Sequence, residues 1–156
     1  MFFTTKGRYG LISMFELAKL DGFGPVPLSE ISKRVSVSLG YLEQIFLVLR
    51  KSGLIKSVRG AKGGYVLAKR PSEISVGDIL KNLEGPLVAA ECVMKGETEA
   101  GTCDTYDSCA TRVVLTKVTQ AVDKVIESTS LQDMLVDAYF VAGIKGLHPT
   151  EPEDKK

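Results

Sequence analysis

The stretch SLGYLEQIFLVLRKSGLIKSVRGAKGGYVLAK, residues 38–69, changes its periodicity half-way along and thereby decides the fold. In its first part, apolar residues recur at helical spacing, with Ser38 placed to cap the helix and Gly53 to follow its end. That apolar stripe consists of Leu42, Ile45, Phe46 and Leu49. In its second part, the short β-branched runs LIKSV and YVLAK flank the glycine-rich, cationic RGAKGG. The stretch therefore predicts a helix followed by a β-hairpin.

A shorter helix is expected directly before this stretch. Residues 28–35, LSEISKRV, place apolar residues at positions 28, 31 and 35, and only the polar SVS separates them from the next helix. Two helices joined by so few residues predict a helix-turn-helix, and the hairpin that follows makes it a winged helix. A further helix over residues 6–20 precedes them and ends at DGFGPVP.

The rest of the chain is predicted to be helical around one irregular polar stretch, residues 91–109. Ser75 and Asp78 have capping-box spacing at the start of a short helix, and Ser130 and Asp133 repeat it later. A long helix is expected over residues 110–127. The predicted fold class is mainly α with a small β-hairpin wing and a long dimerisation helix. The predicted divisions are a winged-helix DNA-binding domain (1–85), a cysteine-bearing sensor loop (86–109), a dimerisation helix with a C-terminal helix (110–146) and a disordered tail (147–156).

Composition and charge narrow the class of protein. The chain has 156 residues, of which 44% are hydrophobic and 25% charged, values typical of a globular protein. It contains no membrane-length apolar run and no secretory signal at its start, so we expect a cytoplasmic protein with reduced thiols. Residues 1–85 carry 13 Lys/Arg against 7 Asp/Glu, whereas residues 86–156 carry 7 against 12. This asymmetry suggests that the first half meets a polyanion.

The predicted winged helix carries groups suited to double-stranded DNA. Polar residues near the start of a recognition helix read base edges, so Gln44 would suit adenine and Glu43 would suit cytosine. The candidate DNA-binding residues of this helix are Ser38, Gly40, Tyr41, Glu43, Gln44, Arg50 and Lys51. The hairpin tip adds Arg59, Lys62, Gly63 and Gly64, and the first helix adds Lys6 and Arg8. The alternative is a solvated basic face on a winged-helix module that binds proteins.

One face of the long helix is too apolar for a lone surface helix. We therefore expect it to pair with its own copy in a homodimer. The predicted interface residues are Val114, Val118, Ala121, Val122 and Val125.

All three cysteines, Cys92, Cys103 and Cys109, lie in the polar stretch. Their spacing is too open for a zinc knuckle, and an odd number of cytosolic thiols argues against disulfides. Thiolates in a loop suit an iron–sulfur cluster, and Cys109 stands where a helix N-terminus lowers a thiol pKa. From spacing alone, a cluster, a thiol switch and incidental surface cysteines all remain open.

Several strings carry a resemblance to a known family. TTKGRYGLISMFELA, PLSEIS, residues 38–69 and ISVGDIL resemble the winged-helix regulators IscR, NsrR and CymR, and above all the iron–sulfur regulator branch, IscR. The resemblance implies a homodimer joined by the long helix, with two wings on a palindromic operator. It also implies that the three cysteines hold an iron–sulfur cluster, of the 2Fe–2S type by similarity to that branch.

Two departures from the family pattern concern the cluster. Ten residues separate the first two cysteines, more than the family usually has, and Arg112 stands where the family places a histidine ligand. Arginine stays protonated and is not expected to bind iron. Arg8 likewise replaces an aspartate that serves as a ligand in NsrR. The candidates for a fourth ligand within the chain are Asp107, Asp104, Glu91 and His148, and a water, a small thiol or a backbone donor also remains open.

The expected function is that of a dimeric transcriptional regulator, mostly a repressor, whose cluster senses iron–sulfur status, oxygen or nitric oxide. One alternative is a cluster-free, CymR-like regulator of sulfur metabolism controlled by a regulatory partner protein or by thiol oxidation. Another is a zinc-stabilised module that binds proteins. An enzyme is not expected, because the chain has no recognisable catalytic set or phosphate-binding motif.

Overall fold

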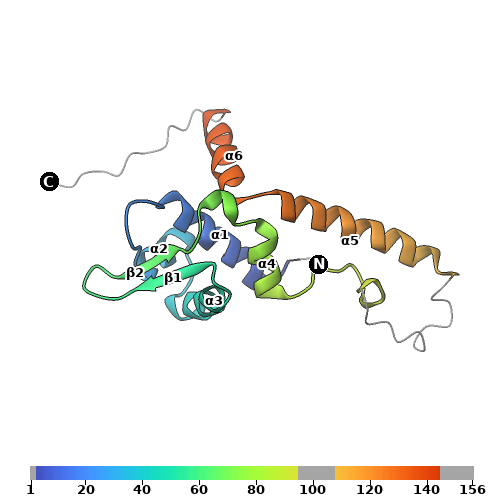
Figure 1. Cartoon of the computed structure of the whole chain (residues 1–156), viewed down its shortest axis with the longest axis horizontal. Coiled ribbons are helices and arrows are strands. Elements are labelled where there is room, and N and C mark those ends of the chain that lie inside the picture. Colours follow the sequence, from blue (N-terminus) through green and yellow to red (C-terminus); the bar gives the residue numbers. More distant parts are fainter. Residues whose placement is uncertain (1–2, 95–107, 145–156) are drawn as a thin grey trace.

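The computed structural model of the protein describes residues 3–94 and 108–144, and it is mainly helical (Figure 1). The α-helices are α1 (Thr5–Lys19), α2 (Leu28–Val35), α3 (Leu39–Lys51), α4 (Val76–Glu84), α5 (Ala110–Ser128) and α6 (Leu131–Ile144). Two strands, β1 (Ile55–Val58) and β2 (Gly64–Leu67), form an antiparallel hairpin, and two short 3₁₀ helices are η1 (Pro71–Glu73) and η2 (Glu91–Val93). This architecture confirms the predicted fold class.

The core lies between α1, α2, α3, α4 and the hairpin. All four residues of the predicted α3 stripe are completely buried, and the Phe46 ring meets the Tyr65 ring of β2 edge to face at 5.0 Å. Leu131, the first residue of α6, is also completely buried in this core. The start of α6 therefore belongs to the same packed unit as the winged helix, because burial of such side chains is the main stabilising term.

The hairpin has a third partner that the periodicity did not predict. Ile55 pairs with Leu67 and Val58 with Gly64, and Val26 forms a further antiparallel bridge to Tyr65 on the open edge of β2. The Val26 backbone N–H donates to the Tyr65 carbonyl at 2.9 Å, and the Tyr65 N–H donates back at 2.8 Å. A single residue has no period, so only the folded chain shows this pairing.

The predicted element ends are correct to within one or two residues. α1 begins one residue earlier than expected, because the Thr4 hydroxyl accepts from the backbone N–H groups of Lys6 and Gly7. At the end of α3, Gly53 has φ 76°, a left-handed conformation that glycine adopts without steric cost. η1 and η2 were not predicted, since a three-residue turn is too short to show periodicity.

α5 extends away from the core and is attached along one side (Figure 1). Its Ile126 packs with Val76, Leu80 and Leu87 in a second apolar cluster. The Lys81 ammonium on α4 lies 2.7 Å from the Glu127 carboxylate and 3.1 Å from that of Asp123. None of the described helices combines the length and apolarity needed to cross a membrane.

Candidate DNA-binding surface and cysteine segment

The start of α3 presents polar groups to solvent. The Ser38 hydroxyl accepts from the Tyr41 backbone N–H at 3.4 Å and caps the helix. Gly40, Glu43 and Gln44 are exposed, whereas Tyr41 is half-buried. The predicted base-reading residues thus lie opposite the buried stripe, on a helix narrow enough for the major groove.

The hairpin tip exposes Arg59 and Lys62. Gly63 and Gly64 are half-buried instead. A Cβ atom at Gly63 would collide with the carbonyl oxygen of Val58, and one at Gly64 would collide with that of Val26. The chain packing of the wing therefore requires these glycines, whether or not DNA is bound.

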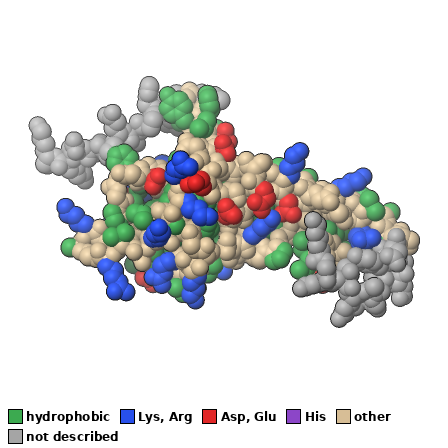
Figure 2. Space-filling model, viewed as in Figure 1, with side chains coloured by type: hydrophobic (Ala, Val, Ile, Leu, Met, Phe, Trp, Pro, Cys, Tyr) green, Lys and Arg blue, Asp and Glu red, His purple; other side chains and the backbone are tan. Residues whose placement is uncertain are grey.

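The cations of this surface form no ion pairs within the described residues, a property that they share with Lys33, Lys56, Lys69, Lys117 and Lys124. Within residues 3–94 and 108–144, ion pairs hold Lys19, Arg34, Arg70 and Lys81. None of the cations predicted to contact DNA has a carboxylate within ion-pair distance in those ranges: Lys6, Arg8, Arg50, Lys51, Arg59 and Lys62. Figure 2 shows Lys and Arg side chains along the edge where α3 and the hairpin lie. Unpaired cations on one face favour phosphate binding.

The paired cations serve the folded structure. A hydrogen bond from Arg70 is the main reason that the pKa of the Glu73 carboxyl lies below its usual value. A hydrogen bond to Glu127 is the main reason that the pKa of the Lys81 ammonium is raised. Lys81 thus connects α4 to α5, and Arg70 closes the turn after β2.

Two of the three predicted thiol ligands lie in the described residues. Cys92 in η2 and Cys109 before α5 are half-buried, and neither is in a disulfide. The Cys109 Sγ accepts from the Arg112 backbone N–H at 3.4 Å and caps α5. Cys103, Asp104, Asp107 and His148 lie outside the described residues.

The segment that carries Cys92 is attached to α5. The Ala89 backbone N–H donates to the Thr119 hydroxyl at 3.0 Å, and Thr119 is one of the few buried polar residues, 7% exposed. The neighbouring Leu87 is 6% exposed in the second apolar cluster. No three His, Cys, Asp or Glu side chains gather into a metal-sized group within the described ranges. Glu91, beside Cys92, is exposed.

The predicted dimer stripe is exposed on α5. Val114, Val118 and Val125 are 59%, 38% and 63% exposed, and Ala121 lies exposed between them. Val122 is half-buried and packs against the cluster shared with α4, so it also stabilises its own chain. Thr119 and Ile126 face the chain's own core, which leaves the stripe without an intramolecular partner among the described residues.

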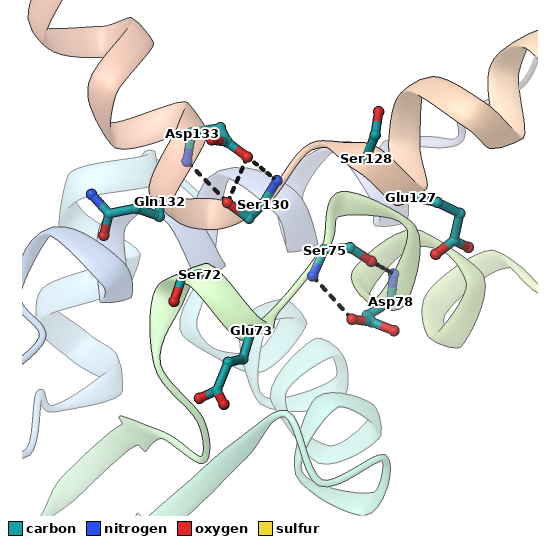
Figure 3. A pocket seen from close by; sticks show the side chains of 9 residues that line it. All are labelled: Ser72, Glu73, Ser75, Asp78, Glu127, Ser128, Ser130, Gln132 and Asp133. Atoms are coloured by element: carbon teal, nitrogen blue, oxygen red, sulfur yellow. Dashed lines mark hydrogen bonds between the residues drawn. The ribbon is translucent and has the colours of Figure 1, made fainter.

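A polar cavity of about 580 Å³ lies where α4 and α6 begin (Figure 3). Both predicted capping boxes line it. The Ser75 and Asp78 groups exchange two hydrogen bonds of 2.9 Å, and Asp133 accepts from the Ser130 hydroxyl at 2.6 Å. Ser75 and Ser130 also form a backbone bridge, which joins the two helix starts. The capping hydrogen bonds of the two helices account for the polar side chains that line this cavity.

Comparison with known proteins decides the family. The family model of Rrf2, described as an iron-dependent transcriptional regulator, matches residues 3–137. The chain belongs to the Rrf2 family. This result confirms the family resemblance inferred from residues 3–85 and makes the chain a winged-helix transcriptional regulator.

The relatives of this chain include CymR and IscR proteins. CymR of Bacillus subtilis is 43% identical over 84% of this chain and 87% of its own length. Its solved structure, that of a global cysteine regulator, superposes with a TM-score of 0.72 at 42% identity, covering 86% of this chain and 95% of that one. IscR of Klebsiella pneumoniae is 35% identical over 95% of this chain and 89% of its own length. The structure of T. potens IscR is 43% identical, with a TM-score of 0.71 and 88% coverage of both chains. These relatives are transcriptional regulators rather than enzymes, as expected.

Three contacts of this region were not found by sequence reasoning. The Tyr9 ring meets the Tyr41 ring edge to face at 6.3 Å, Thr119 binds the cysteine segment, and Glu84 binds the start of α1. The one sequence signal for the last is the pair Gly7 and Gly10, whose i, i+3 spacing indicates a closely packed helix face.

Proposed function

We propose that this Rrf2 protein is a dimeric DNA-binding regulator, mostly a repressor, that acts on a palindromic operator in the cytoplasm. The observation that carries the proposal is the polar start of α3 beside unpaired cations on α3, α1 and the wing. Glu43 and Gln44 read base edges in the major groove. Arg59 and Lys62 extend the contact to the flanking backbone or minor groove.

The dimer is formed by the exposed stripe of α5. Val114, Val118, Ala121 and Val125 recur every three or four residues, the spacing that lets two helices interlock. A two-fold dimer presents two identical recognition helices, and such a pair fits a palindrome. The exposure of this stripe in the single chain supports the pairing.

The regulatory group we propose is an iron–sulfur cluster, of the 2Fe–2S type, held by Cys92, Cys103 and Cys109. The two described thiols are half-buried and unbridged, and one caps a helix, which suits anionic sulfur ligands. The family description names iron, and the similarity to IscR points the same way. When bound, such a cluster supplies a centre sensitive to iron supply, oxygen and nitric oxide.

The chain's own contacts give the cysteine segment a route to the rest of the protein. Ala89 is hydrogen-bonded to α5 through Thr119, and Leu87 is packed against α4. A change in the order of this segment would therefore bias the packing between the winged helix and α5.

A single preparation tests the regulatory group. Protein purified without oxygen is expected to be coloured and to contain iron and acid-labile sulfide. It should lose the colour in Cys92→Ala, Cys103→Ala and Cys109→Ala variants. The matched control is Ser108→Ala, beside Cys109, which should retain the colour. Colourless protein with zinc or free thiols alone would overturn the cluster while leaving DNA binding open.

A second candidate is a cluster-free regulator of cysteine metabolism, controlled by a partner protein or by thiol oxidation. The observation in its favour is the 43% identity to CymR, a cysteine regulator. In that case the protein binds its operator equally well with and without iron, and operator affinity responds to thiol oxidants or to an added protein. The iron measurement and the operator affinity together separate the two candidates.

A further inference from the structure

The carboxylate of Glu84, the last residue of α4, lies inside the first turn of α1. It accepts hydrogen bonds from the Gly7 backbone N–H at 2.7 Å, the Thr4 hydroxyl at 2.5 Å and the Thr4 backbone N–H at 3.2 Å. The first N–H groups of a helix have no partner within the helix, and an anion there is favoured by the helix dipole. Glu84 therefore stabilises the start of α1 from a distance of 77 residues or more along the sequence.

Close packing holds this carboxylate in place. A Cβ atom at Gly7 would collide with the Glu84 carboxylate, and one at Gly10 would collide with the side chain of Leu83. Both glycines face α4 and are buried. Figure 1 shows the start of α1 beside the end of α4. The two helices can approach this closely only because α1 has no side chains at these positions.

The turn that Glu84 holds is connected to the recognition helix. It carries Lys6 and is followed by Arg8, whose guanidinium lies 5.3 Å from the centre of the Tyr9 ring. The Tyr9 ring in turn packs against Tyr41, in the first turn of α3. The position of Arg8 relative to α3 thus depends on the first two turns of α1 being in place.

We propose that Glu84 is a positioning residue for DNA binding. It fixes the start of α1 so that Lys6 and Arg8 meet backbone phosphates beside the groove that α3 enters. This inference rests on the proposed DNA binding. Glu84 itself is negatively charged, so a direct effect of its charge would oppose DNA binding, and its removal would strengthen the complex. A positioning role predicts instead that removal of Glu84 weakens the complex.

The test is duplex binding by the full-length protein, with an operator selected from random sequence, at several salt concentrations. Glu84→Ala is expected to weaken binding roughly tenfold. The slope of log affinity against log salt, which is negative, should decrease in magnitude by about 0.9 for each phosphate that the variant no longer neutralises. Glu84→Gln keeps an acceptor oxygen and should restore most of the affinity. The control Asp137→Ala removes one exposed carboxylate from α6 and should not weaken binding.

A second variant disturbs the same contact without removing the carboxylate from the chain. Gly7→Ala raises helix propensity but displaces the Glu84 carboxylate. It should therefore weaken DNA binding and decrease the magnitude of the salt slope, as Glu84→Ala does. The Lys6→Ala/Arg8→Ala protein supplies the background for a double-mutant cycle. In that background, Glu84→Ala should cause no further decrease in affinity.

The outcomes separate this inference from the proposed function. Absence of duplex binding by the wild-type protein at low salt overturns both. If the wild type binds, wild-type affinity in Glu84→Ala and Gly7→Ala overturns the positioning role alone. An equal decrease in affinity on adding Glu84→Ala to the Lys6→Ala/Arg8→Ala protein overturns it as well, because Glu84 would then act through other groups.

Discussion

Apolar side chains differ in solvent exposure between two regions of the molecule. These regions are the winged helix, residues 3–85, and the two C-terminal helices, α5 and α6. In α3 the apolar stripe is completely buried. In the C-terminal helices, by contrast, Val114, Val125, Tyr139 and Phe140 are all 59% exposed or more. Soluble proteins rarely leave such runs open to water. The comparison indicates that the winged helix is stabilised within one chain, whereas the C-terminal helices need a second surface.

Charge divides the molecule along the same line. The cations proposed to contact DNA lie on α1, α3 and the wing, whereas α5 supplies the two carboxylates that pair with Lys81. Figure 2 shows most of the visible acidic side chains across the middle of the molecule, with Lys and Arg side chains among them. The proposed contact with a polyanion and the proposed contact between copies therefore lie on different parts of the chain.

The largest effect is expected from the core of the winged helix. Phe46→Ala removes a completely buried ring in contact with Tyr65 and should lower the free energy of unfolding by about 3–5 kcal/mol. The neighbouring Leu47 is 42% exposed, so Leu47→Ala should change the free energy of unfolding by less than about 1 kcal/mol. Urea denaturation measures both. Equal decreases would show that the winged helix is not stabilised by its own core.

The next effect concerns pairing of the C-terminal helices. Val118→Asp with Val125→Asp places charges in the α5 stripe and should weaken the dimer at least about a hundredfold, as sedimentation equilibrium would show. Phe23, 87% exposed in the winged helix, supplies the control, and Phe23→Asp should remain dimeric. A fully dimeric double variant would contradict the assignment of this stripe.

A smaller effect distinguishes unpaired from paired cations. Arg59→Ala should weaken duplex binding and reduce the salt slope by about 0.9 for each phosphate left without a cation. Arg70 is 80% exposed but paired with Glu73, so Arg70→Ala should leave the slope unchanged. Identical slopes for the two variants would argue against the wing as a DNA-binding element.

The smallest effect is expected for the pH dependence of stability at the start of α6. The Ser130 hydroxyl and backbone lower the pKa of the Asp133 carboxyl. A lowered pKa contributes stability above the unfolded value, about 4, and this contribution is lost as the pH falls through the folded value. Ser130→Ala should therefore lower the thermal midpoint slightly at pH 7 and by less at pH values below the folded pKa, where only the bond from the Asp133 backbone N–H to the Ser130 hydroxyl is lost. A constant difference at all pH values would exclude linkage to Asp133.

Local features were predictable from the sequence, and long-range contacts were not. Periodicity located the α3 stripe, and turn chemistry located Gly53 and both capping boxes, because these signals act within a few residues. The Val26–Tyr65 bridge and the Glu84 cap join residues far apart in the chain. They depend on how the helices pack, which no local pattern specifies.

The candidate DNA-binding surface and the α5 stripe were likewise predictable only where local patterns specify them. The exposed start of α3 follows from its amphipathic period, and the free stripe of α5 follows from the excess of valine on one face. The requirement for Gly63 and Gly64 in chain packing does not, since it arises from the carbonyl groups of Val58 and Val26.

The proposed function depends above all on α5 pairing two copies so that two winged helices bind one palindrome in fixed register. An operator with ~5 bp, half a helical turn, inserted between its half-sites tests this pairing. We expect affinity to fall at least about a hundredfold with that insertion and less with ~10 bp, because the second recognition helix must face the same side of the duplex. Unchanged affinity with the ~5 bp insertion would contradict binding of one operator by two coupled winged helices.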